Sequence, residues 1–491
     1  MCAMPASWSL RYAFFSVFAT YVFVTPAHAE TLAPPEVVPA APATVMTPMA
    51  GSGAQGGIDA VWSTLAPEGG AHWEAAAGPQ EGMDMLSAVR QTVEGHPSVR
   101  NAVSNLQRSE EYIGVARAAY YPQIKGGLSS ELSNRDIGRF ENKRVQKLSV
   151  SASQMLYDFG KVRSNVDQAQ AGQAVARARL LATVDQMGRE AAQSFIEVQR
   201  YEALTRIADE QIRGVAAIAR LAKERRALGA STLSDEVQAQ SREDAARATS
   251  VQMVSQWERW RANLRNLLGQ QQTPEVEGEV PLGFSGACQV GEPNWQAIPS
   301  VMLALAEQRE AEAALDGAAA QTLPTISLEG SASRALNVSN SDSRNDATVG
   351  LNFSMPFYQG GGLQAQKRAA SHGLQAAQAA NANAMRTVTQ GLLDAREQAL
   401  GYELRAPILA QRTQSSRQTR DLYRQQYLDL GTRTLLDLLN AEQEFHQSKV
   451  EVVNNMYDLY RLQLDCLFYT GQVRSVFGLD GSTIAGVEIQ P

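Results

Sequence analysis

Residues 228–240 read LGASTLSDEVQAQ, and residues 430–442 read LGTRTLLDLLNAE. Six of the thirteen positions are identical, whereas average residue usage gives roughly one match by chance in such a window. The same offset of 202 residues carries Pro122 onto Pro324, and an offset of 201 carries Tyr157 onto Tyr358. The chain therefore contains one unit twice. Each unit is about 200 residues long, which is typical of duplicated halves rather than of short solenoid repeats.

The first 29 residues are typical of a secretory signal peptide. Arg11 precedes an apolar run over residues 12–24, and residues 26–29 (PAHA) fit a cleavage site made of small residues. A membrane anchor is the alternative, but the run is shorter than the roughly 20 residues that cross a bilayer as a helix. No later segment is apolar enough for a transmembrane helix, so a membrane role would have to use strands. The residue directly after the predicted cleavage site is Glu30 rather than cysteine, which disfavours a lipid anchor.

Charge and composition exclude several functions. The formal net charge is −7 and becomes more negative when Arg11 is removed, whereas nucleic-acid binding needs basic faces against phosphate. The few histidines show no metal-ligand spacing, and no catalytic arrangement is visible, so we predict neither an enzyme nor a cofactor. Cys288 and Cys466 remain after the signal is removed, in an export pathway that permits disulfides. A bridge between them and a pair of unpaired buried thiols are both compatible with the sequence.

The mature chain divides into two repeats with connecting segments. Residues 30–82 are rich in Ala, Pro and Gly, and such a composition buries too little apolar surface to order itself, so we expect a flexible extension. The first repeat is predicted over residues 83–282 and the second over 298–475. Residues 283–297 are the expected linker between them, and 476–491 the expected C-terminal tail.

Each repeat carries a helix followed by two strands. A helical pattern runs from Asp84 to about Ala119 and stops at Pro122, which lacks a backbone donor. The β-hairpins are predicted over 123–157 and 325–357, with the first pair of strands at 123–133 and 147–156. Polar and apolar residues alternate over about ten residues, the length of a tilted membrane-spanning strand.

The composition of the strands favours a membrane barrel over a soluble hairpin. The polar face of residues 147–153 is almost entirely serine, which a small soluble core would not contain. Aromatic residues lie at the helix-side ends of the strands, where membrane barrels carry an aromatic girdle. These residues are Tyr120, Tyr121, Tyr157, Phe159, Phe357 and Tyr358.

A very long helix follows each hairpin. In residues 160–228 the apolar and small residues from Leu180 to Ala222 keep a strict 4-3 spacing, the period of a left-handed coiled coil. At about 1.5 Å per residue this helix is roughly 100 Å long. A second helix, about 232–268, is expected to return antiparallel. The second repeat matches with residues 363–429 and 432–470.

Four strands per chain require an oligomer. Open strand edges in lipid would leave backbone groups unsatisfied at several kcal/mol each. Two chains would give eight strands and a filled interior, whereas three would give twelve and room for a pore. All helices would then lie on one side of the membrane, the periplasm.

The paired hairpins and the GTRTLLDLLNAE segment at residues 431–442 resemble the TolC family of outer-membrane efflux and secretion channels over nearly all of residues 84–475. The resemblance implies a mixed α and β fold: a trimeric twelve-stranded outer-membrane β-barrel, with four strands per chain, continued by a periplasmic α-helical coiled-coil barrel. It also implies partners, namely a homotrimer in outer-membrane lipid, a periplasmic adaptor (membrane fusion) protein and an inner-membrane ABC or RND transporter.

In that family the helical tips form the periplasmic entrance. The resemblance places a ring aspartate at Asp437, a network arginine at Arg433 and its acidic partner at Asp235; Asn440 stands where the family has a second ring aspartate. The family's tyrosine three residues before the glycine is Leu428 here, with Tyr427 beside it. The expected tip and adaptor-docking residues are Leu228, Gly229, Thr232, Leu430, Gly431 and Thr434.

The residues themselves give a simpler role for these acids. An aspartate early in a helix complements the helix dipole, and Thr232 or Thr434 are good N-cap residues. Capping and exposure to a channel are compatible with each other.

For function, the sequence favours the exit duct of a tripartite export system, and within that class type I protein secretion. The tyrosine-rich strand start and the missing lipid-anchor cysteine resemble type I members slightly more than small-molecule efflux members, which are the alternative. A secreted coiled-coil scaffold without a pore is the competing class. It accounts for the long helices but not for four alternating, serine-lined strands.

Overall fold

The computed structural model describes residues 82–133, 143–272, 274–277, 282–284, 286–289, 293–336 and 345–489, which belong to one compact unit. The predicted signal peptide and almost all of the predicted extension lie outside the described residues. The elements of the first repeat are α2 (Met85–Gly95), α3 (Pro97–Arg117), β1 (Gln123–Ser133), β2 (Lys143–Tyr157), α4 (Lys161–Ala227) and α5 (Leu233–Leu268). Those of the second are α6 (Pro299–Ala320), β3 (Thr325–Ala335), β4 (Asn345–Ser354), α7 (Gly362–Gln425), the π-helical turn η5 (Gln426–Leu430) and α8 (Leu435–Thr470).

Both repeats therefore have the same order of helix, hairpin, long helix and return helix, as the sequence predicts. The single helix predicted over 84–119 is wrong, because α2 and α3 are separated at His96. Pro97 occupies the first turn of α3, where its missing N–H costs nothing. The strand β2 begins at Lys143, four residues before its predicted start.

The four strands form one antiparallel sheet in the order β1-β2-β3-β4. In the register, Val150 lies opposite Gly126 and Ala332, while Ser151 lies opposite Lys125 and Ser331. One face is thus an apolar row and the other a polar row, as the alternation predicts. Gln154 interrupts the apolar face, and its amide donates to the Tyr120 carbonyl at 2.9 Å. The sheet is open, with β1 and β4 at its edges.

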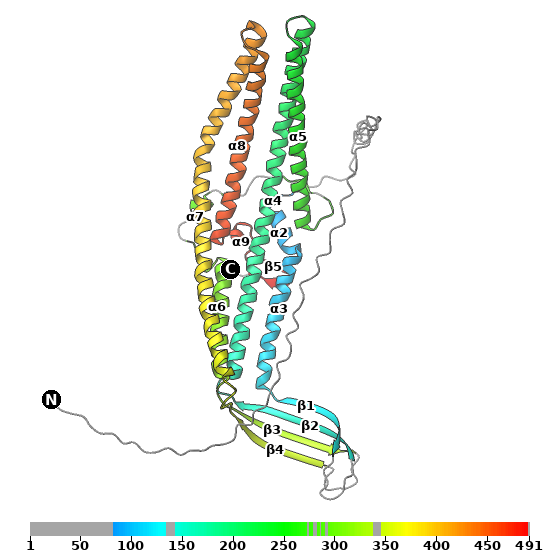
Figure 1. Ribbon diagram of the computed structural model, residues 1–491, viewed down its shortest axis with the longest axis vertical. Coiled ribbons are helices and arrows are strands. Elements are labelled where there is room, and N and C mark those ends of the chain that lie inside the picture. The colour runs from blue at the N-terminus through cyan, green and yellow to red at the C-terminus, as the bar shows by residue number, and fades with distance from the viewer. Residues whose placement is uncertain are drawn as a thin grey trace, which may run out of the picture. The chain divides into compact units, whose positions relative to one another are not determined.

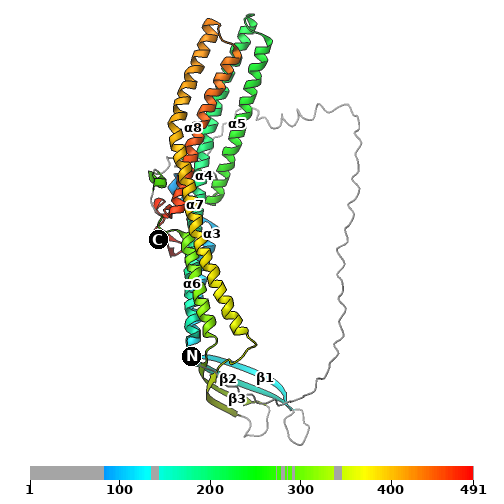
Figure 2. The ribbon, with the colours of Figure 1, turned by 60° about the vertical axis from the view of Figure 1, so that its left-hand side comes forward.

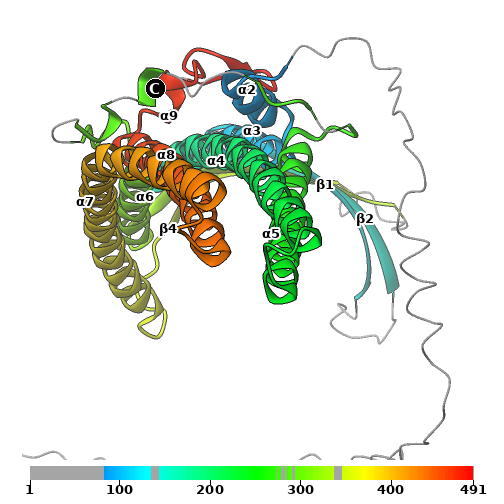
Figure 3. The ribbon, with the colours of Figure 1, turned by 90° about the horizontal axis from the view of Figure 1, so that it is seen from above.

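The long helices form a curved row above the sheet (Figure 1). In the part of the row near the strands, the helices follow one another in the order α3, α4, α6 and α7. In the part near the tips, the order is α5, α4, α8 and α7. Seen from above, this row bends so that α5 and α7 lie at its two ends (Figure 3). Among the described helices none combines the length and apolarity that a bilayer-crossing helix requires.

The helix α4 holds the two repeats together. Its predicted 4-3 seam is buried or half-buried from Leu180 to Ala222. Between α4 and α8, Arg189 pairs with Asp465 at 2.6 Å and Arg200 pairs with Asp458 at 3.1 Å. These cross-repeat ion pairs lie at intervals along α4, so the return helix of the second repeat is fixed along the long helix of the first.

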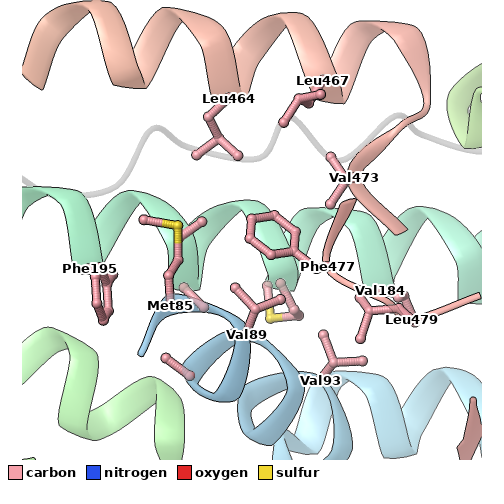
Figure 4. Close-up of a cluster of buried hydrophobic side chains, with 14 of the residues drawn as sticks. Met85, Val89, Val93, Val184, Phe195, Leu464, Leu467, Val473, Phe477 and Leu479 are labelled. Carbon is pink, nitrogen blue, oxygen red and sulfur yellow. The ribbon is translucent and has the colours of Figure 1, made fainter. Parts of the chain in front are cut away.

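The main hydrophobic core lies midway along the helices, where α2, α4, α8 and the C-terminal residues meet (Figure 4). Residues 476–489, predicted as a tail, fold back onto this core through a four-residue helix, α9 (Val473–Val476), and a two-stranded turn, β5 (Thr483–Ile484) with β6 (Val487–Glu488). Phe477, Leu479 and Ile489 are almost fully buried. The predicted linker also contributes, since Cys288 in a short 3-10 turn forms a disulfide with Cys466 of α8. Free thiols, the alternative left open by the sequence, are not what the structure contains.

Candidate functional site

The two helical hairpins end side by side at the end of the molecule opposite the strands (Figure 2). At the first tip the chain leaves α4 through Gly229, whose φ of 75° is left-handed. Glycine adopts this conformation without the penalty that a Cβ brings. The amide of Ala230 then donates to the Arg225 carbonyl at 2.7 Å, which closes the end of α4.

The repeated Thr and Asp begin the return helices. The Thr232 hydroxyl accepts from the Asp235 amide at 3.1 Å, and the Asp235 carboxylate accepts from the Thr232 amide at 3.0 Å. Thr434 and Asp437 make the same reciprocal pair at 3.2 Å each. Each tip therefore contains a capping box. The two copies of the sequence share these residues because both tips need the same turn. In each, a glycine ends the first helix and a Thr–Asp pair begins the return helix.

Hydrogen bonding lowers the pKa of both aspartates below the usual value of 3.8. For Asp235 the main cause is the backbone amide of Thr232, followed by the Ser231 hydroxyl. For Asp437 it is the Thr434 hydroxyl, then the Thr434 amide. A carboxyl with a lowered pKa stabilises the fold above the unfolded value and loses that contribution as the pH falls. Both caps are thus fully charged at neutral pH.

Tyr427 joins the two tips, and the sequence did not single it out for this role. Its ring is buried, while the neighbouring Leu428 is 40% exposed. The Arg225 guanidinium lies 4.8 Å from the ring centroid and donates to the Tyr427 carbonyl at 3.2 Å. The Tyr427 hydroxyl lies close enough to Ser231 to interact with it, and the Ser231 hydroxyl donates to Asp235 at 2.9 Å.

Tyr427 lies in a π-helical turn, one position before the place where the resemblance leads us to expect a tyrosine. A π-turn holds one residue more than an α-turn and therefore shifts the phase of the side chains that follow. In η5 this turn places Tyr427, rather than Leu428, against α4. Burial raises the Tyr427 pKa, so the phenol is neutral at physiological pH.

The other two predicted entrance residues, Arg433 and Asn440, have different partners and do not form one network. Arg433 stacks on the Tyr423 ring at 4.3 Å and donates to the Gln426 side chain at 3.1 Å. Among the described residues no hydrogen bond or ion pair joins it to Asp235, and its nearest acidic effect is on the pKa of Asp437, which hydrogen bonds from Thr434 lower more strongly. Asn440 accepts from Arg242 of α5 at 3.3 Å, a partner that sequence spacing did not reveal because α5 and α8 belong to different repeats.

Apolar side chains at the tips are exposed. Leu228 is 83% exposed and Leu430 is 67% exposed. Three further apolar residues on the first turns of the return helices are also exposed: Leu233, Val237 and Leu436. Exposed apolar groups gathered at one end are typical of a protein-interaction surface.

At the opposite end, all six predicted girdle residues are exposed where the strands meet the helices. The Tyr157 and Phe159 rings pack edge to face at 4.6 Å. On the sheet, Ile124, Val349 and Leu351 are more than 70% exposed. The apolar face of the sheet is therefore uncovered within one chain. No group of three or more His, Cys, Asp or Glu side chains among the described residues is placed to hold a metal ion.

Comparison with known proteins gives consistent matches. The family described as "Outer membrane efflux protein" matches residues 88–270 and 296–471. The outer membrane efflux protein BepC of Brucella suis biovar 1 (strain 1330) is 23% identical over 408 residues, covering 79% of this chain and 85% of the relative.

Solved structures share the fold. CusC, described in work on folding and transmembrane channel formation, superposes with a TM-score of 0.71 at 18% identity, covering 82% of this chain and 95% of CusC. The outer membrane protein VceC from Vibrio cholerae gives a TM-score of 0.69 at 18% identity, covering 79% and 96%. The fold class predicted from the sequence is confirmed.

Proposed function

We propose, from the premise that the chain belongs to the outer membrane efflux protein family, that it is the exit duct of a tripartite export system. The predicted resemblance to the TolC family is confirmed by this membership and by the solved relatives. Membership makes the chain an outer-membrane protein and a passive channel rather than an enzyme. The observation that carries the proposal is the exposed, apolar-faced sheet joined to long helices that end in two matched tips.

The open edges of the sheet support a homotrimer. Strands β1 and β4 lie at opposite edges, and an unpaired edge in lipid costs several kcal/mol per unsatisfied group. Pairing β4 of one protomer with β1 of the next is a head-to-tail contact, which closes into a ring. Three protomers give twelve strands around a pore lined by the serine-rich face, with the apolar face toward lipid.

The tips are the proposed periplasmic entrance. A helix of 67 residues is about 100 Å long at 1.5 Å per residue, which separates the tips from the membrane by most of the periplasm. We assign Asp437 and Asn440 to the lining of the entrance. Among the described residues Arg433 forms no ion pair, and its charge acts within the chain only as a minor contribution to the lowered pKa of Asp437, after the hydrogen bonds from Thr434. We propose Asp235 on the tip of the adjacent protomer as its ion-pair partner.

The exposed leucines at the tips are the proposed docking edge for a periplasmic adaptor, which would connect the duct to an inner-membrane transporter of the ABC or RND type. A photo-crosslinking residue at Leu430 tests this assignment. Crosslinks to a periplasmic protein are expected from Leu430 but not from the matched exposed position Leu404 in mid α7. Equal labelling from both positions would contradict tip docking.

Two cargo classes are candidates, and each rests on one observation. The tyrosine-rich strand start, the feature on which the sequence favours type I secretion, supports a polypeptide cargo. The printed name of BepC, an efflux protein, supports small molecules.

A deletion strain distinguishes the two cargo classes. Loss of a secreted protein with unchanged drug sensitivity would assign protein secretion, and the converse would assign efflux. Complementation with the intact gene is the control. A soluble periplasmic monomer in fractionation, in place of heat-resistant trimers in the outer membrane, would contradict the duct itself and support a scaffold.

A further inference from the structure

The polar face of the sheet carries charged side chains in a regular pattern. Side chains are described for the strand residues 123–130, 146–157, 325–335 and 345–354, and the charged ones, all exposed, are Lys125 on β1, Lys147 on β2, Glu329 and Arg334 on β3, and Asp346 on β4. The register places Arg334 on the apolar face and the other four on the polar face, with Ser151 and Ser331. Among these residues the first hairpin therefore supplies bases to the polar face, and the second supplies acids.

Lys125 and Glu329 lie toward the helix end of the sheet and border the same depression in its polar face, of about 430 Å³. The Glu329 carboxylate accepts hydrogen bonds from the Ser327 hydroxyl at 3.2 Å and from the Asn352 amide at 3.0 Å, so it is held on this face. Strand β2 separates the two charges, which puts about 10 Å between their strands at about 4.8 Å per strand. Lys125 forms no hydrogen bond or ion pair with a described residue, and both charges therefore act on the space above the face.

Closure of the barrel turns this pattern into rings, a step that rests on the proposed trimer in which β4 of one protomer pairs with β1 of the next. Lys125 lies opposite Ser151 and Glu329 lies opposite Ser153, so these two charges are at nearly the same level. Because β1 and β3 are every second strand around the closed barrel, a base and an acid alternate there. Lys147 on β2 and Asp346 on β4 alternate in the same way on the remaining strands, nearer the other end of the sheet.

We infer that these two rings balance the charge of the barrel lumen, and that Lys125 and Glu329 are the residues that set the balance at its helix end. Opposite charges that alternate around a wall cancel near the axis, whereas charges of one sign add there and enrich ions of the other sign. A barrel lined in this way passes cargo of either charge. Selection by charge is then left to the tips, about 100 Å away along α4.

The size of the effect follows from the dimensions of the barrel. Twelve strands about 4.8 Å apart and tilted by about 40° close into a circle of about 12 Å radius, and inward side chains bring the charges to about 10 Å from the axis. The Debye length is also about 10 Å at 0.1 M ionic strength. Removing one sign from a ring should therefore change the concentration of each monovalent ion at the axis by about twofold, and the cation-to-anion permeability ratio by about fourfold.

Ion selectivity of the full-length protein in planar bilayers tests this inference. The zero-current potential in a potassium chloride gradient gives the permeability ratio of potassium to chloride. Glu329→Gln is expected to lower this ratio about fourfold and Lys125→Gln to raise it about fourfold, and the double variant should return it to the wild-type value. Both shifts should grow as the salt is diluted to about 0.01 M, where the Debye length is about 30 Å.

The sheet supplies its own control. Arg334 lies on β3 with Glu329 but on the apolar face, opposite Leu148, so Arg334→Gln removes a charge that does not face the lumen and should leave the permeability ratio unchanged. The tips contribute the same selectivity to every variant, so each shift is read relative to the wild type. Repeating the set in Tyr427→Ala reduces the contribution of the tips and should enlarge the shifts.

Two results would overturn the inference: single variants that conduct with the wild-type ratio in both backgrounds, or two shifts in the same direction. A wild-type protein that forms no channel would instead contradict the proposed duct, so the two failures are distinguishable. If Glu329→Gln did not form heat-resistant trimers, because it alters a hydrogen-bonded carboxylate, the second ring would decide. Lys147→Gln and Asp346→Asn should then shift the ratio in opposite directions, and unchanged ratios would overturn the inference.

Discussion

Replacing Tyr427 should open the entrance in two graded steps. The phenylalanine variant removes only the hydroxyl that lies near Ser231. A polar contact of this kind contributes about 1 kcal/mol, which corresponds to about fivefold in the closed-to-open ratio. The alanine variant also removes the buried ring beneath Arg225. Truncating a buried aromatic residue costs about 3–5 kcal/mol, so the ratio should change by on the order of 100-fold or more.

Single-channel recording in planar bilayers measures this effect directly. Conductance and open probability should rise from wild type to Tyr427→Phe to Tyr427→Ala. The control is Leu428→Ala, because this neighbour is 40% exposed and does not belong to the buried cluster in which Tyr427 packs against α4. Wild-type conductance from Tyr427→Ala, in trimers that remain heat-resistant, would refute the view that this ring holds the two tips together.

Three further changes have defined outcomes. Arg433→Ala combined with Asp437→Ala should raise single-channel conductance, because it removes a cation and the carboxylate that caps α8; unchanged conductance and unchanged cation block would count against both assignments. Cys288→Ser should lower the free energy of unfolding by about 2–5 kcal/mol, measured as a fall in the temperature at which the trimer dissociates, and reductant should reproduce it in the wild type only. Gly471→Ala should destabilise the fold because φ is 73° and the new Cβ would lie 2.6 Å from the Ala297 carbonyl; Gly401→Ala, in open space on α7, is its neutral control, and equal dissociation temperatures would contradict the strain.

The parts of the fold that follow from periodicity could be predicted from the sequence. The strand at Gln123–Ser133 has its predicted limits, because polar and apolar residues alternate along all of it and a proline precedes it. The long helix after the first hairpin ends within a residue of its prediction, since glycine stops it. The break at His96 was missed although Pro97 signals a helix start, because the apolar pattern continues across it.

Features that depend on contacts between repeats could not be predicted in the same way. A π-turn has no marked sequence preference, so η5 could not be predicted from residues 426–430 alone. It lies where Tyr427 packs against Arg225 of the other repeat. The bond between Arg242 and Asn440 joins residues 198 positions apart. The packing of residues 476–489 depends on a core that α2, α4 and α8 supply jointly, so the short segment alone resembled a tail.

The capping role that the structure shows for Asp235 and Asp437 is compatible with the channel role predicted for them. Sequence reasoning treated helix capping as the simpler explanation and the entrance as the functional one. The structure contains both capping boxes, and a capping carboxylate is held in one orientation by two hydrogen bonds. In an entrance lined by such aspartates, the local backbone would fix the position of the negative charges. That Asp235 and Asp437 face the lumen stays a prediction.

The disulfide also determines at which tip proteolytic cleavage would separate the chain into two fragments. Cys288 and Cys466 are 178 residues apart, and this interval contains α6, β3, β4, α7 and most of α8. The second repeat is therefore a covalent loop anchored at mid-height. A protease that cuts the second tip leaves both fragments linked, whereas one that cuts the first tip releases an N-terminal piece held only by packing. The two tips are similar in sequence, but cleavage at the first tip separates the chain into two fragments and cleavage at the second does not.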